Sequence, residues 1–201
     1  MLGPRRMQHV LGVTHTAMAL AAVHRLDVAD VALVALLHDQ SKDVAPQKLR
    51  AELETMGYPL PEEDLDYPHT WHGFHAAALG RIELGIVQPE IIEAVSLHTT
   101  ADAEIGPLTK VIFIADLCEP GREIALASEI LQQARRDLDE AFRRALVHKL
   151  LHVLWKKKAR LHPKAVRALR AHAHLRPEQL AEMAVGDESF VRGEIRQTAG
   201  E

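Results

Sequence analysis

Four prolines divide this chain into short segments with a helical pattern. Pro46, Pro89, Pro107 and Pro163 each stand at the head of a segment in which apolar residues recur near helical spacing. Proline is accepted in the first turn of a helix, where its missing N–H would have no partner, and it ends a helix that precedes it. No stretch of convincing length alternates apolar and polar residues as a strand does. The sequence therefore predicts an all-α fold, a helical bundle in a single domain.

The apolar periods also give the expected order of the helices. They predict helices over residues 7–24, 30–38, 46–57, 70–85, 89–98, 107–119 and 138–160, and a last one from residue 163. A helical pattern continues after Arg122 up to a break at residues 135–137. Residues 58–68 contain three prolines and are expected to form a loop. We expect one domain over residues 1–175 and a loosely ordered tail over residues 176–201, where no period is sustained.

The composition excludes several classes of protein. The chain has 201 residues, of which 47% are apolar and 26% charged, as in an ordinary globular protein. Its net charge of -4 provides no general basic surface for nucleic acid. The single cysteine, Cys118, excludes an internal disulfide framework and a cysteine-based zinc site, and it is expected to pack as a small apolar residue.

The N-terminal region imitates a secretory signal without being one. Arg5 and Arg6 precede a mostly apolar stretch over residues 10–23, but this stretch contains Thr14 and His15. No run of about 18 or more uncharged apolar residues occurs that would cross a membrane. We therefore expect a cytoplasmic protein with no membrane or nucleic-acid partner.

The most apolar segment of the chain ends in two polar residues. Residues 30–38 are nearly all apolar, and the pair His38-Asp39 lies at their C-terminal end. Asp27 or Asp30 could cap the helix expected there. Burying an imidazole and a carboxylate is costly unless something satisfies them, and a metal ion would do so. Four more residues of these types interrupt apolar patterns elsewhere, namely His9, His72, His98 and Asp116.

Four histidines and two aspartates would give two divalent ions six protein ligands. Nitrogen and oxygen ligands without thiolate favour iron or manganese over zinc or cobalt. Such a centre attracts anions and lowers the pKa of bound water, so phosphate esters or anhydrides are the expected substrates. Lys42, which follows His38 by four residues, could neutralise a phosphate oxygen, as could Arg6 and Arg122.

Five short strings occur in a recognisable order over residues 5–122. They are RRMQHVLGV, ALLHDQSK, the pair His72-Gly73, EAVSLHTT and IADLCEPGR. This series closely resembles the HD-domain metal-dependent phosphohydrolases, in particular the YqeK-type symmetrical bis(5'-nucleosyl)-tetraphosphatases. The resemblance implies an all-α HD fold, a diiron centre and hydrolysis of diadenosine tetraphosphate to two ADP by a metal-activated hydroxide.

The resemblance also implies roles for individual residues. The implied metal ligands, with Asp39 as the bridge, are His9, His38, Asp39, His72, His98 and Asp116. The implied substrate-binding residues are Arg6, Asp39, Gln40, Ser41, Lys42, His98, Thr99, Asp116 and Arg122. Asp39 and Lys42 are the expected catalytic residues.

Three positions depart from the family pattern. Ala101 replaces a usual glycine, Ala165 a usual threonine, and Leu169 a usual arginine, the last two near a family segment that lies close to the nucleotide. These departures leave the base and chain-length preference open.

Other assignments stay open at this stage. His69 and His75 flank His72 at three-residue spacing, so either could replace it as a ligand. Glu119 is expected to be a structural carboxylate at a helix stop. An HD-type nucleotidase or nucleoside-triphosphate hydrolase acting on mononucleotides would use the same ligands, and a non-catalytic nucleotide- or metal-binding module is a further alternative. A homodimer is left open.

Overall fold

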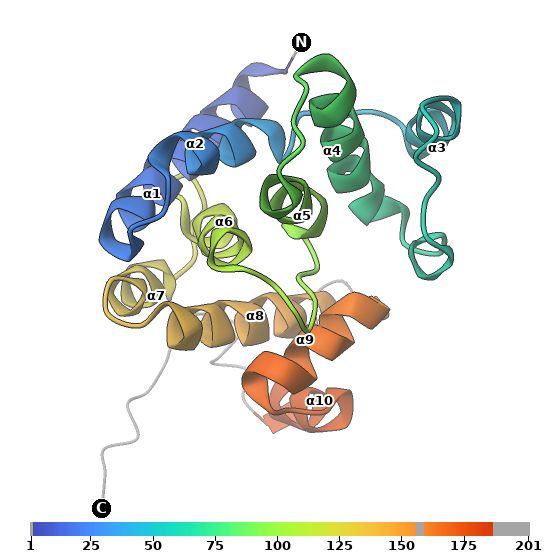
Figure 1. Cartoon of the computed structure of the whole chain (residues 1–201). Helices are drawn as coiled ribbons and strands as arrows, with labels where there is room; N and C mark the ends of the chain where they lie inside the picture. Colours follow the sequence, from blue (N-terminus) through green and yellow to red (C-terminus); the bar gives the residue numbers. More distant parts are fainter. Residues whose placement is uncertain (1, 156–158, 187–201) are drawn as a thin grey trace, which may run out of the picture.

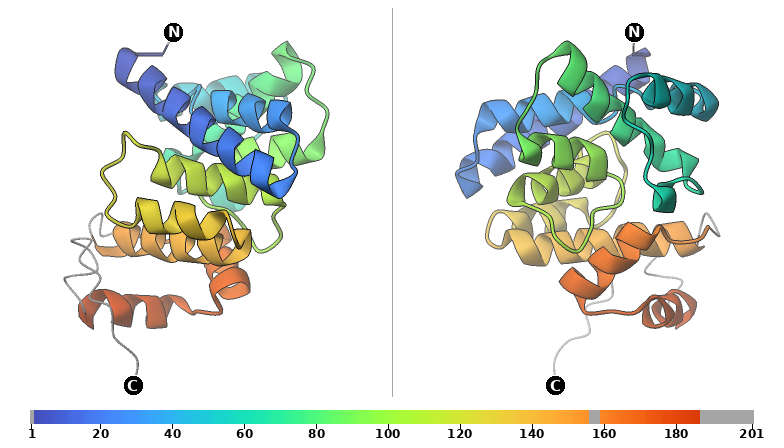
Figure 2. Two further views of the ribbon diagram at one scale, coloured as in Figure 1. Left: turned by 90° about the vertical axis from the view of Figure 1, so that its left-hand side faces the viewer. Right: turned by 45° about the vertical axis from the view of Figure 1, so that its right-hand side comes forward.

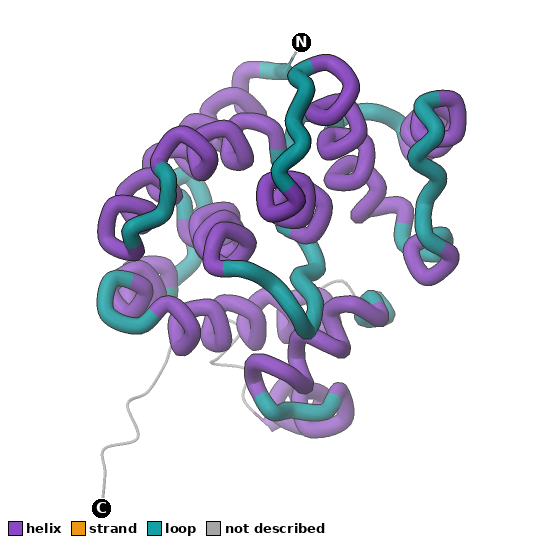
Figure 3. The backbone as a smooth tube through the Cα atoms, viewed as in Figure 1, coloured by secondary structure: helices purple, strands orange, loops and turns teal. Residues whose placement is uncertain are grey.

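The computed structural model describes residues 2–155 and 159–186, and over these residues it contains helices and no strands (Figure 3). The helices are α1 (Pro4–His24), α2 (Val28–Leu37), α3 (Pro46–Thr55), α4 (Trp71–Glu83), α5 (Pro89–Leu97), α6 (Pro107–Cys118), α7 (Ala127–Ala134), α8 (Leu138–Trp155), α9 (Pro163–Ala173) and α10 (Pro177–Gly186). A short 3₁₀ helix, η1 (Glu62–Asp64), lies in the segment expected to be a loop, and a second, η2 (Pro68–Thr70), begins at the last residue of that segment and leads into α4. The predicted all-α class is confirmed.

Local chemistry explains where most helices begin. The four prolines open α3, α5, α6 and α9, as predicted. Asp27, rather than Asp30, caps α2, because its carboxylate accepts hydrogen bonds from the amides of Ala29 and Asp30. Gly57, just after α3, has a φ of 77°, a left-handed conformation that glycine adopts without a steric penalty.

Helix α6 lies at the centre of the bundle. It packs against α1, α5 and α8, and Figure 1 shows it enclosed by these elements. Its residues 111–115 have no exposed surface, and Phe113 contacts Phe142 of α8 edge to face. A helix that is covered on all sides is apolar all round, which explains the run VIFIA. The polar residue that follows this run, Asp116, is therefore placed inside the core.

The other helices form layers on either side of α6. Helices α1 and α2 pack together on one side of it, and α7 and α8 pack together on the other. Figure 2 shows these layers, with α10 on the outer side of α8. Helix α4 packs on α5, and α3 packs on α4 at the periphery of the bundle (Figure 1). Among the described residues no helix is both long enough and apolar enough to cross a membrane.

Two segments differ from the predicted helices. The helical pattern expected after Arg122 begins only at Ala127, because residues 119–126 form turns and irregular backbone, and its predicted break at residues 135–137 is confirmed between α7 and α8. Glu119 ends α6 in an extended conformation, and its carboxylate accepts a hydrogen bond from the amide of Gly121. Helix α8 ends at Trp155, and the residues between it and position 159 lie outside the described ranges.

The tail expected from residue 176 contains a helix. Helix α10 packs on α8, and Leu180 has no exposed surface. Gln179 supports its start by accepting a hydrogen bond from the amide of Arg176. Burial of this single leucine provides a tertiary contact that the weak sequence period does not indicate. The rest of the expected tail, residues 187–201, lies outside the described residues.

Candidate metal centre

Two histidines follow directly after helices and make the same local hydrogen bond. His38 follows α2, with Nδ1 2.6 Å from the carbonyl oxygen of Ala35, and His98 follows α5, with Nδ1 2.8 Å from that of Val95. The last carbonyls of a helix have no partner within the helix, so each ring N–H donates to one of them. This leaves the Nε2 lone pair of each buried ring directed into the core.

The buried ligand-type side chains gather in two triads. His9, His38 and Asp116 form the first, and Asp39, His72 and His98 form the second; within each triad the ligand atoms lie within 4.8 Å of one another. Five helices or their ends bring these residues together, namely α1, α2, α4, α5 and α6. All six residues expected as metal ligands thus lie in one cluster.

The carboxylate of Asp39 lies between the two triads. Its Oδ1 is 3.3 Å from Nε2 of His72 and 3.6 Å from Nε2 of His98. Its Oδ2 is 3.6 Å from Nε2 of His9 and 3.9 Å from Nε2 of His38. One oxygen therefore faces each triad, which is the orientation that a bridging carboxylate requires.

The donor atoms fit divalent cations. Nε2 of His38 is buried and has no hydrogen-bond partner. Nε2 of His72 and Nε2 of His98 lie 3.1 Å apart and both face Asp39. Buried acceptors that face one another destabilise the fold unless a shared cation binds them. Imidazole nitrogen and carboxylate oxygen are ligands for divalent transition metals, so the cluster is compatible with metal binding.

Burial keeps most of these imidazoles neutral. It lowers the pKa of His38 and of His98, and it lowers the pKa of His72 to about 4. A neutral imidazole has a free lone pair, which is the form that binds a metal.

The two carboxylates of the cluster remain charged. Burial works to raise the pKa of Asp39, but the neighbouring imidazoles of His72 and His98 hold it well below its ordinary value. Burial likewise opposes the charge on Asp116, but the ammonium of Lys149 and the other cations around it hold its pKa well below the usual range. Both aspartates are thus in the ionised form that binds cations.

Two cationic side chains expected at the site contact it from different loops. An Nη of Arg122 is 2.7 Å from Oδ1 of Asp116. Lys42 follows α2, and its Nζ is 3.2 Å from Nε2 of His72. Burial lowers the pKa of Lys42, although Asp39 and Asp116 act in the opposite direction.

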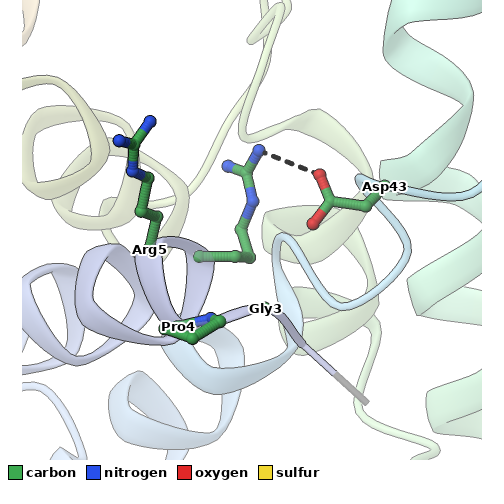
Figure 4. Close-up of a pocket in the computed structure, with 5 residues that line it drawn as sticks. Gly3, Pro4, Arg5 and Asp43 are labelled. Carbon is green, nitrogen blue, oxygen red and sulfur yellow. Dashed lines mark hydrogen bonds and ion pairs between the residues drawn. The ribbon is translucent and has the colours of Figure 1, made fainter.

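Arg6 contacts the centre from the start of α1. One Nη is 2.5 Å from Oδ2 of Asp39, and the other is 3.3 Å from Oδ1 of Asp43. Figure 4 shows the ion pair with Asp43 and the residues Gly3, Pro4 and Arg5, which line a shallow groove together with this pair. Arg6 thus reaches the carboxylate that lies between the two triads.

A pocket of about 420 Å³ opens beside the cluster. Its lining includes His72 and Asp116 at the cluster and Leu161 and Ala165 near the start of α9. Four residues expected to bind substrate also line it, namely Lys42, Thr99, Asp116 and Arg122.

Two other residues expected to bind substrate have different surroundings. Gln40 is exposed, and Ser41 is buried with its hydroxyl 2.8 Å from Nδ1 of His75. Neither is among the described residues that line the pocket. Nε2 of His75 is in turn 2.9 Å from a carboxylate oxygen of Glu52.

The structure distinguishes His72 from its two neighbours. His75 uses both ring nitrogens to contact Ser41 and Glu52, so it is engaged away from the triads. His69 lines the pocket but belongs to neither triad among the described residues. The geometry therefore favours His72 as the ligand.

The three departures from the family pattern lie in different environments. Ala101 is fully buried and has a φ of 56°, a conformation that favours glycine. Ala165 lines the pocket. Leu169 is fully buried in the core.

Glu119 has a larger role than the helix stop that the sequence suggested. It is buried, and an oxygen of its carboxylate is 3.1 Å from Nδ1 of His9. A Cβ atom on either Gly12 or Gly121 would collide with this carboxylate, so both glycines make room for it. Burial lowers the pKa of His9, but hydrogen bonds with Asp116 and Glu119 outweigh burial and raise it above its ordinary value. Glu119 thus orients Nε2 of His9 towards the cluster.

Sequence reasoning also missed Lys149. Its Nζ is 3.4 Å from Oδ2 of Asp116, and the side chain lines the pocket. The available signal was a lysine beside Leu146, Leu150 and Leu151 on the apolar side of a predicted helix.

The all-helical fold and the two triads agree with a known family. Residues 6–121 match the HD domain, so the chain belongs to the HD-domain family. It is similar to the proteins named "Bis(5'-nucleosyl)-tetraphosphatase, symmetrical" from Halalkalibacterium halodurans and Bacillus subtilis. The first is 30% identical over 157 residues, which cover 77% of this chain and 82% of the relative. The second is 28% identical over 156 residues, which cover 77% of this chain and 83% of the relative.

A solved structure has the same fold. It is a crystal structure of a "predicted HD superfamily hydrolase involved in NAD metabolism" from Clostridium acetobutylicum. The two align with a TM-score of 0.79 and 30% identity over 86% of this chain and 91% of the other. The resemblance drawn from the five sequence strings is therefore confirmed at the level of family and fold.

Proposed function

We propose that this protein is a cytoplasmic metal-dependent phosphohydrolase that cleaves diadenosine tetraphosphate symmetrically into two ADP. The observation that carries the proposal is the placement of Asp39 between two triads beside a pocket lined by cationic side chains. Relatives that are named symmetrical bis(5'-nucleosyl)-tetraphosphatases support the choice of substrate.

The proposed centre holds two divalent ions. His9, His38 and Asp116 would hold one ion, and Asp39, His72 and His98 the other, with Asp39 shared between them. We propose iron as the native metal, with manganese next, because the ligands are nitrogen and oxygen without thiolate. When bound, such ions supply Lewis-acid activation of water and neutralise phosphate charge.

The cationic side chains have a separate task in the proposed reaction. Lys42 and Arg122 line the pocket beside the triads and would bind the phosphate oxygens that gain negative charge. In symmetrical cleavage, the oxygen of water bonds to the phosphorus that is second from one nucleoside. The bond from that phosphorus to the central bridging oxygen breaks, this oxygen leaves with the second ADP, and the protons of water are released. The pocket must therefore hold one ADP unit before the scissile bond.

Product analysis tests this proposal directly. Metal-loaded protein is incubated with diadenosine tetraphosphate, and the nucleotides are separated and identified. ADP as the sole product supports the proposal, whereas AMP with ATP, or no turnover, contradicts it. Turnover of mononucleotides alone would favour the other HD-type activity, which would use the same ligands.

A further inference from the structure

Lys149 is a largely buried lysine at the wall of the pocket. It extends from α8, and its Nζ lies 4.3 Å from the ring centre of Phe113 and 3.3 Å from the carbonyl oxygen of His98. The carboxylate it faces is Asp116, at 3.4 Å. About 20% of its side chain is exposed, and Lys149 lines the same pocket as Lys42 and Arg122.

Pairing with Asp116 does not by itself explain why a lysine stands at position 149. Asp116 already has a shorter ion pair, 2.7 Å long, with Arg122. Under the proposed function, Asp116 also binds a metal ion. This ion partly neutralises the carboxylate and so weakens its attraction for the ammonium of Lys149. A partly desolvated ammonium whose partner is shared in this way favours binding of a further anion, and Lys149 lines the pocket where such an anion would bind.

We infer that Lys149 is a substrate-binding residue that holds a phosphate oxygen of a nucleoside diphosphate unit in this pocket. Together with Lys42 and Arg122 it places three cations, from three separate segments of the chain, around one pocket. This inference rests on the proposed function, because it takes the pocket to be the site for one ADP unit. It differs from a structural role, in which Lys149 would only hold Asp116.

The test compares two lysine-to-methionine variants that each remove an ammonium between α6 and α8. Lys149→Met removes the proposed phosphate ligand, whereas Lys110→Met removes an ion pair with Asp139, 2.7 Å long, outside the pocket. Binding of ADP, pyrophosphate and adenosine is measured by calorimetry on metal-loaded protein. Metal content and melting temperature are measured on the same samples.

The inference predicts a selective loss of phosphate binding. Lys149→Met raises the Kd for ADP and for pyrophosphate about tenfold or more, as expected for one charge-assisted hydrogen bond, and leaves adenosine binding and metal content unchanged. Lys149→Arg, which keeps the charge, recovers part of the affinity. Lys110→Met leaves all three affinities unchanged.

Other outcomes would overturn the inference. If Lys149→Met binds ADP with unchanged affinity, Lys149 does not hold the phosphate. If it loses affinity for adenosine as much as for ADP, or loses its metal, Lys149 acts only on the structure of the pocket or through Asp116. Absence of ADP and pyrophosphate binding by the unmodified protein would overturn the phosphate site itself. If the unmodified protein binds ADP but does not hydrolyse diadenosine tetraphosphate, the proposed function fails while the assignment of Lys149 stands on its own measurement.

Discussion

The hydrogen bonds of individual imidazoles determine what this centre can bind. His38 and His98 each donate from Nδ1 to a helix carbonyl, and His9 has a carboxylate, Glu119, at the same position. Each bond fixes the tautomer and directs Nε2 towards the cluster. Partners of this kind that support the ligands from outside normally strengthen metal binding.

Removing the partner of His9 is expected to weaken the first triad. Glu119→Ala lowers the affinity for metal about 10- to 100-fold, because the ring of His9 loses its orientation. Elemental analysis after dialysis against a metal buffer measures the remaining metal. Glu123→Ala, which changes an exposed acidic residue nearby, is the matched control and keeps its metal. Full metal retention by Glu119→Ala would contradict the role of Glu119.

Lys42 is expected to affect turnover rather than folding. Its Nζ is 3.2 Å from Nε2 of His72, beside the proposed reaction site, so Lys42→Ala lowers kcat for diadenosine tetraphosphate about 100-fold. Steady-state kinetics with product identification provides the measurement. Lys48→Ala is the control, since that side chain is 66% exposed on α3. An unchanged kcat in Lys42→Ala would show that this lysine does not stabilise developing charge.

Single residues also show why the site was only partly predictable. His38 and Asp39 stood out because they follow an apolar segment, which made burial of polar groups foreseeable. Glu119 stands next to Pro120 at an expected helix end, and Lys149 stands next to leucines without any sign of which residue it contacts. Only the packing of α1 and α8 against α6 reveals what they contact.

At the scale of elements, a network of ion pairs attaches the segment between α3 and α4 to α9. The buried carboxylate of Asp64 forms an ion pair with Lys164, and Glu63 pairs with Arg167 at 2.7 Å. Arg167 also bonds Asp102, 2.7 Å away, in the turn between α5 and α6. This network supports the wall of the pocket where α9 begins.

The network predicts a dependence of stability on pH. The hydrogen bond from Arg167 lowers the pKa of Glu63 to about 2, from an ordinary value of 4.5. A lowered pKa means that the stabilisation is complete above pH 4.5 and is lost as the pH falls towards 2. Since about a third of the Glu63 side chain is exposed, screening by solvent reduces its contribution to about 1 kcal/mol.

Glu63→Gln isolates this contribution. The variant is expected to unfold more easily than the unmodified protein at pH 6, and the difference in free energy of unfolding shrinks as the pH falls to 3. Urea unfolding at a series of pH values measures both curves. Glu62→Gln is the control, because its carboxylate is exposed and forms none of these ion pairs in the described structure. Parallel curves for Glu63→Gln and the unmodified protein would contradict the assignment.

The helices were largely predictable because prolines mark their starts. The structure differs from the prediction just after Arg122, where the carboxylate of Glu119 bonds the amide of Gly121 and α7 begins only at Ala127. It also differs at α10, where burial of Leu180 provides a tertiary contact that a local period does not contain.

At the scale of the whole molecule, one core brings together ligands that are far apart in the sequence. The six candidate ligands extend from His9 to Asp116, and α6 connects the layers that carry them. Apolar patterns interrupted by histidine or aspartate marked all six positions, and the resemblance to the HD family assigned them roles as ligands. The net charge of -4 is compatible with an anionic substrate, because the cations that matter are gathered at one pocket.

We propose that activity requires two ions, one on each side of Asp39. Metal-stripped protein is titrated with Mn²⁺ or Fe²⁺ while bound metal and the formation of ADP from diadenosine tetraphosphate are followed together. We predict two ions per chain, with ADP formation appearing as the second ion binds, and loss of both the second ion and activity in Asp39→Ala. Full activity with one ion or none, or an active Asp39→Ala variant, would contradict the account.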